Sequence, residues 1–106
     1  MAADKEAGHL SVTDAHYADG SLAERTWRLG PAMHNDNGPS YLQYYKSGQE
    51  KMRYYTRLGK FHNALGPAIV ERWTDGSVHR CVFYINGEEI TEEEFLKLSS
   101  TKAARS

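Results

Sequence analysis

The 106-residue chain is poor in cysteine and proline and has almost no net charge, with one cysteine, three prolines and a formal charge of −1. The single cysteine, Cys81, excludes a disulfide within the chain, and its place in the apolar run 81–85 predicts a packed side chain in a reducing compartment. The charge balance excludes the strongly basic surface of a general nucleic-acid binder. No stretch approaches the roughly 20 apolar residues of a membrane-spanning helix, and the N-terminus lacks the apolar core of a signal peptide. We therefore expect a single cytoplasmic domain without membrane contact.

Motifs that carry chemistry are also missing. The chain has no Gly-x-Ser-x-Gly elbow, no phosphate-binding loop and no helix-borne metal motif, so we predict no catalytic residue, no cofactor and no metal. His34, His62 and His79 are the best metal candidates, but a zinc site needs three or four converging ligands. The Asn that follows two of these histidines favours turns, because asparagine tolerates left-handed backbone geometry.

What the chain does have is an internal period of 28 residues. Gly20, Gly48 and Gly76 each follow Asp or Ser and are separated by this step. The same step relates two aromatic series, which are Tyr17, Tyr45 and Trp73, and Trp27, Tyr55 and Phe83. A period in this range indicates stacked units, because one short unit cannot bury its apolar face alone.

Each unit predicts a β-hairpin, since aromatic-rich segments flank Asp-Gly or Ser-Gly turns. We predict an all-β fold with a short C-terminal helix, in which about three stacked hairpins form an antiparallel meander of about six strands. The predicted boundaries are an N-terminal segment 1–9, a degenerate first repeat 10–33, a second repeat 34–61, a third repeat 62–89, a capping helix 90–98 and a frayed tail 99–106.

The predicted helix begins after a capping box. Thr91 and Glu94 have the required spacing, and Ile90 and Phe95 form the matching hydrophobic staple. We expect the helix to run from about Glu92 to Leu98 and to cover the open end of the sheet.

The recurring pattern His-Asn-x-x-Gly-Pro-(Ala/Ser), strand, (Asp/Ser)-Gly, strand, (Leu/Asn)-Gly resembles the MORN-like repeats. It is most similar to their variant Gly-Pro-Ala form, found in bacterial, phage and large-virus proteins. The resemblance covers roughly residues 17–90 and implies tandem β-hairpins that serve as a scaffold or protein-interaction module. Lipid-head-group binding is sometimes proposed for such proteins. The resemblance implies no catalytic residues.

The two aromatic series are predicted to be core, because aromatics in register pack neighbouring hairpins together. The remaining tyrosines and nearby cations are the predicted partner-binding surface, since Tyr and Arg are enriched at protein interfaces. This set is Tyr41, Tyr44, Lys51, Arg53, Tyr54, Arg80 and Tyr84. The sequence leaves open which face of the sheet is buried.

Two functions remain in view. The first is a non-catalytic module that binds another protein, with a small phage-encoded inhibitor of a host protein as one hypothesis that rests on the resemblance alone. The second is a small-ligand or nucleic-acid receptor that uses the aromatics with Arg25, Arg53 and Arg80. An exposed edge at the first repeat also makes a homodimer a reasonable hypothesis.

Overall fold

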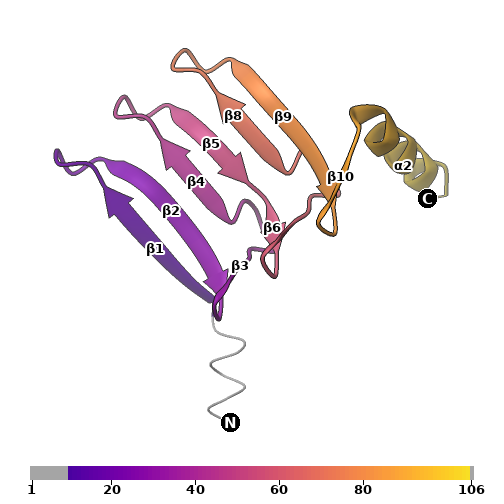
Figure 1. Cartoon of the computed structure of the whole chain (residues 1–106), viewed down its shortest axis with the longest axis horizontal. Helices are drawn as coiled ribbons and strands as arrows, with labels where there is room; N and C mark the ends of the chain where they lie inside the picture. Colours follow the sequence, from indigo (N-terminus) through magenta and orange to yellow (C-terminus); the bar gives the residue numbers. More distant parts are fainter. Residues whose placement is uncertain (1–9, 106) are drawn as a thin grey trace, which may run out of the picture.

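The computed structural model describes residues 10–105, with side chains up to residue 98, as a thin, broad sheet with a helix at one end (Figure 1). Its principal extents are 48 × 47 × 22 Å. The radius of gyration is 15.9 Å, against about 13 Å for a compact domain of this length. The described chain is therefore built on one layer of strands. The predicted N-terminal segment, residues 1–9, lies outside the described residues.

Three long hairpins lie side by side in the sheet (Figure 1). They are β1 (Leu10–His16) with β2 (Leu22–Leu29), β4 (Tyr41–Tyr44) with β5 (Glu50–Tyr54), and β8 (Ile69–Arg72) with β9 (Val78–Ile85). The strand order is β1-β2-β4-β5-β8-β9-β10, and every pair is antiparallel. The hairpin turns place Gly20, Gly48 and Gly76 at φ of 91°, 92° and 91°, where glycine has no steric cost. The predicted all-β antiparallel fold with a C-terminal helix is confirmed.

A short hairpin follows each of the long ones. β3 (Ala32–Met33) pairs with the end of β2, β6 (Thr56–Arg57) pairs with β7 (Lys60–Phe61), and β10 (Glu88–Ile90) pairs with the end of β9. The turns at 58–59 and 86–87 have positive φ at both central residues, which is the geometry that tight hairpins require. Of these turns, only Asn86-Gly87 has the Asn-Gly sequence typical of a tight hairpin turn.

Phenol groups join each long hairpin to the next. Tyr17 Oη donates to the Tyr44 carbonyl at 2.6 Å, and Tyr45 Oη donates to the Arg72 carbonyl at 2.8 Å. The two donors are 28 residues apart in the sequence, and so are the two acceptors. The recurrence of tyrosine at this step thus has a physical role, because the ring bridges to the neighbouring strand while its hydroxyl satisfies a backbone carbonyl.

Histidines join the short hairpins in the same way. His34 Nδ1 accepts the Leu58 N–H at 2.9 Å, and His62 Nδ1 accepts the Asn86 N–H at 3.0 Å. Each donor is the first residue of the positive-φ turn in the next short hairpin. The recurring histidine is therefore a structural acceptor, which requires the neutral ring to carry its proton on Nε2.

The core is small, as one layer of strands dictates. Its buried apolar side chains are Ala68, Ile69 and Val70, in and just before β8, together with Phe95. Cys81 is paired with Val70 but is exposed, so the prediction of a packed cysteine is wrong. The reason is that β10 pairs only with residues 83–85 of β9, which leaves residues 78–82 of β9 as an edge of the described sheet.

Helix α2 (Glu92–Arg105) begins at the predicted capping box. The Glu94 N–H donates to Thr91 Oγ1 at 3.1 Å, and the Thr91 N–H donates to Glu94 Oε1 at 2.8 Å. Phe95 packs on Phe83 with ring centroids 4.8 Å apart, which anchors α2 against β9. The helix continues well past Leu98, through most of the predicted frayed tail, because the residues beyond it include good helix formers and no glycine or proline.

Candidate functional site

The two faces of the sheet differ in chemistry. On one face, the rings of Tyr41, Tyr54, Phe61 and Tyr84 form a continuous row, here called the tyrosine face. Successive ring centroids are 5.3, 5.1 and 5.1 Å apart, within the range of attractive aromatic contacts. All four rings are half-buried. The row crosses from the second long hairpin to the third, so it forms only where the hairpins pack side by side.

Acidic side chains hold polar groups on this same face. Tyr41 Oη donates to Glu24 Oε2 at 3.2 Å, and burial together with the Glu24 carboxylate raises the pKa of Tyr41 to about 12. Glu71 binds Arg80 at 2.9 Å and lies 3.5 Å from His79. The charges beside the aromatic row are thus paired with one another.

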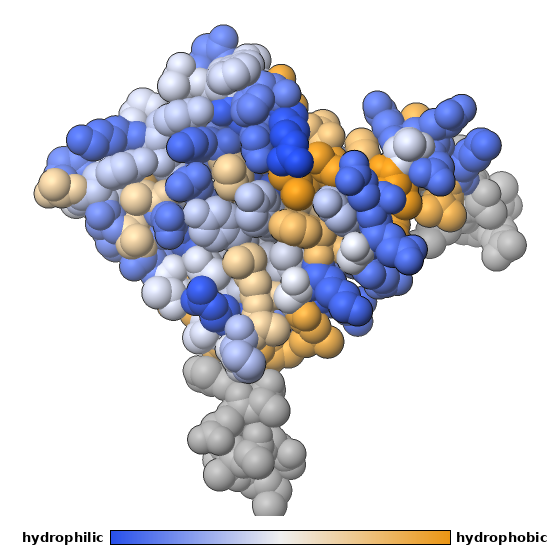
Figure 2. Space-filling view, in the orientation of Figure 1, coloured by the Kyte–Doolittle hydropathy of each residue, from blue (hydrophilic) through white to orange (hydrophobic). Residues whose placement is uncertain are grey.

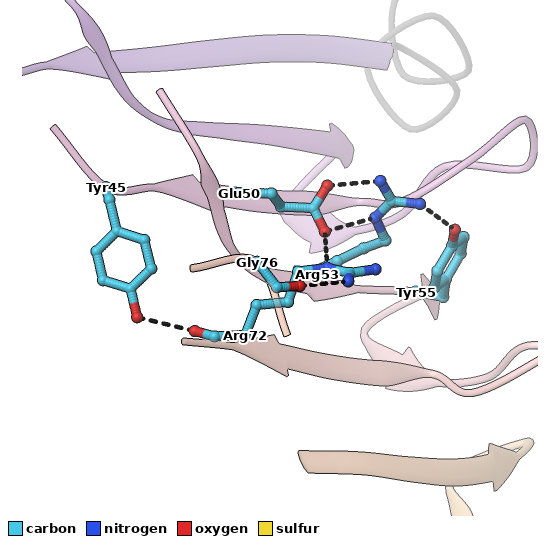
Figure 3. Close-up of polar contacts among 6 residues, drawn as sticks. All are labelled: Tyr45, Glu50, Arg53, Tyr55, Arg72 and Gly76. Atoms are coloured by element: carbon cyan, nitrogen blue, oxygen red, sulfur yellow. Dashed lines mark hydrogen bonds and ion pairs between the residues drawn. The ribbon is translucent and has the colours of Figure 1, made fainter. Parts of the chain in front are cut away.

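The opposite face holds a cluster of one carboxylate and two guanidiniums, drawn in Figure 3. Glu50 accepts Arg53 Nε at 3.1 Å and Arg53 Nη2 at 2.5 Å, and its Oε2 lies 3.6 Å from Arg72 Nε. Arg53 Nη1 also donates to Tyr55 Oη at 3.2 Å. The hydrogen bonds to Glu50 raise the pKa of the Arg53 guanidinium above its usual value. Two cations share one anion here, so the cluster has an excess positive charge.

A cleft of about 700 Å³ opens beside this cluster. Its walls include Arg53, Arg57, Arg72, Tyr55 and His62, and its rims are residues 35–38 and 63–67. We call it the arginine cleft. Two asparagines shape the rims, since the side-chain amides at positions 35 and 63 donate to the carbonyls at positions 39 and 67 at 2.9 and 3.0 Å. The recurring Asn and Gly-Pro of the sequence therefore shape this cleft.

The predicted partner-binding residues are distributed over both faces. Tyr41, Tyr54, Arg80 and Tyr84 lie on the tyrosine face, Tyr44 and Arg53 lie on the opposite face, and Lys51 lies at a bulge with its ammonium 5.5 Å from the ring centre of Tyr45. Strand alternation explains the division, because successive side chains point to opposite faces.

Several residues of these surfaces were missed. Phe61 completes the aromatic row, yet it lies in the short β6–β7 hairpin, which was not among the predicted hairpins. The signal that could have found it is the 28-residue relation between Leu58-Gly59 and Asn86-Gly87. Glu50 and Arg72 carried no comparable signal, because their pairing depends on a bulge in the β4–β5 register.

One member of the predicted aromatic core is not buried. Trp73 is 55 % exposed and stacks on His79 at 4.0 Å, so the prediction that it is core is wrong. Its counterparts Tyr17 and Tyr45 reach the next long hairpin, and within the described residues no further long hairpin follows that of Trp73. In the second series, Phe83 is covered by Phe95 of α2.

No group of three or more His, Cys, Asp or Glu side chains among the described residues is arranged to hold a metal ion. His34 Nδ1 and His62 Nδ1 are occupied by backbone donors. No helix in the described part of the chain is both long and apolar enough to cross a membrane.

In comparisons with family models, curated proteins and solved structures, nothing matches this chain. Its function therefore has to be inferred from its residues and their geometry.

Proposed function

We propose that the chain is a non-catalytic protein-binding module whose tyrosine face contacts the partner. The observation that carries the proposal is the row of four half-buried aromatic rings on a single-layer sheet. Tyrosine offers a large, rigid contact area with a polar tip, and aromatic side chains dominate the binding energy of protein interfaces. No described element covers this row with a second layer of strands.

The charges favour a protein partner over a nucleic acid. The arginines of the nucleic-acid hypothesis are each bound to a carboxylate: Arg25 to Asp14 at 2.7 and 2.8 Å, Arg53 to Glu50, and Arg80 to Glu71. A phosphate backbone would have to compete with these carboxylates for every one of them.

The test is affinity purification of the tagged protein from a bacterial lysate, with and without nuclease, followed by mass spectrometry. The choice of lysate follows from the resemblance to phage and bacterial repeats. We expect a stoichiometric protein that survives nuclease treatment. Capture that depends on nucleic acid would contradict the proposal.

Matched variants then locate the surface. Tyr84→Ala, at one end of the row, and Tyr54→Ala, within it, should each reduce capture of that protein about tenfold or more. Tyr44→Ala is the control, because it removes the same half-buried residue type from the opposite face. Equal losses from Tyr84→Ala and Tyr44→Ala, or a loss from Tyr44→Ala alone, would show that the tyrosine face is not the contact surface.

A further inference from the structure

The arginine cleft lies on the face opposite the tyrosine face and is chemically distinct from it. Three arginines and one aspartate, Asp36, are the charged residues that line it. Its volume of about 700 Å³ falls in the range of clefts that bind small ligands or short peptide segments. The lining charge favours an anionic occupant.

Two features hold the positive charge ready for a ligand. Arg53 and Arg72 share Glu50, whose side chain is only 15 % exposed, so the carboxylate fixes two guanidiniums at the cleft wall and neutralises one of them. Arg57 is exposed and makes no ion pair with any residue in the described part of the chain. An unpaired guanidinium beside a pre-positioned pair is suited to carboxylate or phosphate.

The residues of the rim favour a carboxylate ligand over a phosphate. Leu65 lies at the tip of the 63–67 rim and is 94 % exposed. Its N–H donates to Asn63 Oδ1 at 3.0 Å, which fixes the loop that presents it. An exposed leucine offers nothing to a phosphodiester backbone but can pack against an apolar side chain. A protein segment that alternates acidic and apolar residues matches both the wall and the rim.

We propose that the arginine cleft binds an acidic segment of a partner protein, with carboxylates on Arg57 and Arg72 and an apolar side chain on Leu65. The inference rests on the proposed function in that the occupant is a protein. It assigns a second contact surface, on the face that the tyrosine row does not use, and states the chemistry of what that surface recognises.

The test uses defined probes and the full chain. A fluorescein-labelled octapeptide of alternating glutamate and leucine is titrated with the protein by fluorescence anisotropy, at two salt concentrations. The comparison probes are the same peptide with glutamine for glutamate, an octaglutamate, and a labelled deoxythymidine octamer. We expect the glutamate–leucine peptide to bind best, with affinity that falls as salt rises.

Matched variants place the contact in the cleft. Arg57→Gln should weaken binding of the glutamate–leucine peptide about fivefold, whereas Arg80→Gln, the same charge change on an exposed arginine of the opposite face, should leave it unchanged. Leu65→Ser should weaken the glutamate–leucine peptide and not octaglutamate. Neither Arg57 nor Leu65 is buried, so the fold should tolerate both changes.

Four results would overturn the inference: absence of peptide binding, equal binding of the glutamine peptide, equal effects of Arg57→Gln and Arg80→Gln, or tighter binding of the deoxythymidine octamer. The last would reassign the cleft to phosphate. Failure here is distinguishable from failure of the proposed function, since Tyr84→Ala tests the tyrosine face with a partner captured from lysate. Peptide binding that is unchanged by Tyr84→Ala but weakened by Arg57→Gln supports the cleft by itself.

Discussion

Glu50 is the side chain whose removal should most clearly test the charge arrangement. It is 15 % exposed and lies against Arg53 and Arg72, which are 36 % and 32 % exposed. Glu50→Gln keeps the shape and one acceptor but removes the charge, so the two guanidiniums lose their shared anion and repel each other. A hydrogen bond to a charged group contributes roughly 1.5–3 kcal/mol, and partial exposure of both arginines reduces this to about 1.5 kcal/mol for the substitution.

The assay is urea unfolding followed by circular dichroism, with thermal unfolding beside it. A loss of about 1.5 kcal/mol lowers Tm by roughly 6–10 °C for a domain of this length. Glu71→Gln is the matched control, because Glu71 is 17 % exposed and also lies against two basic side chains, His79 and Arg80, but Arg80 is 51 % exposed. We expect Glu71→Gln to cost about 0.5 kcal/mol.

A double-mutant cycle isolates the pair. Arg53→Gln should destabilise the protein less in the Glu50→Gln background than alone, by about 1 kcal/mol. Equal losses from Glu50→Gln and Glu71→Gln, or a coupling energy near zero, would refute the view that Glu50 holds the guanidiniums in place. A stabilising Glu50→Gln would show that desolvation of the carboxylate outweighs its attraction to the arginines.

Three further predictions concern stability. Leu58 has φ of 50° although it is not glycine, so Leu58→Asn should raise the unfolding free energy by about 0.5–1 kcal/mol. Asn86→Leu at the corresponding turn should lower it by a similar amount. Urea unfolding measures both, and changes of the same sign in the two variants would contradict the turn argument. His34→Leu should cost about 2 kcal/mol because His34 is buried and the Leu58 N–H loses its acceptor, and His62→Leu should cost less because His62 is less buried. A ranking in the opposite order, by the same assay, would show that the acceptor role is minor. Burial and the Glu24 carboxylate raise the pKa of Tyr41 from its ordinary 10 to about 12, so between these values the unfolded chain loses the proton while the folded chain keeps it, and stability should fall as pH rises through this window. Tyr41→Phe should flatten the decline between about pH 10 and 12, and an unchanged slope would refute the assignment.

The long hairpins could be predicted from the sequence because their signals are local. A glycine after Asp or Ser at a 28-residue step fixes each turn, and the capping box at Thr91 and Glu94 fixes the start of α2. These features depend on a few neighbouring residues and on backbone geometry that only certain residue types adopt.

The faces could not be predicted, because they depend on register and on what lies beyond each strand. Alternating aromatics on both sides of the second hairpin give no preferred face, and bulges in the β4–β5 and β8–β9 pairs shift the alternation. Cys81 and Trp73 were expected to be packed from their local sequence. They are exposed because the described sheet ends beside them. Where the sheet ends depends on the whole fold and not on the residues next to Cys81 or Trp73.

The edges of the described sheet also offer a route by which copies of the chain can associate. The outer side of β1 and residues 78–82 of β9 are unpaired strand edges within the described sheet, and both carry exposed apolar side chains, with Val12 54 % and Val78 48 % exposed. Unpaired edges are where another strand adds. A second copy that adds at either edge extends the sheet in its own plane, so the tyrosine face and the arginine cleft both stay accessible. Self-association and partner binding are therefore compatible in this architecture, and light scattering of the complex should show one partner for each copy of the chain whether or not two copies are joined.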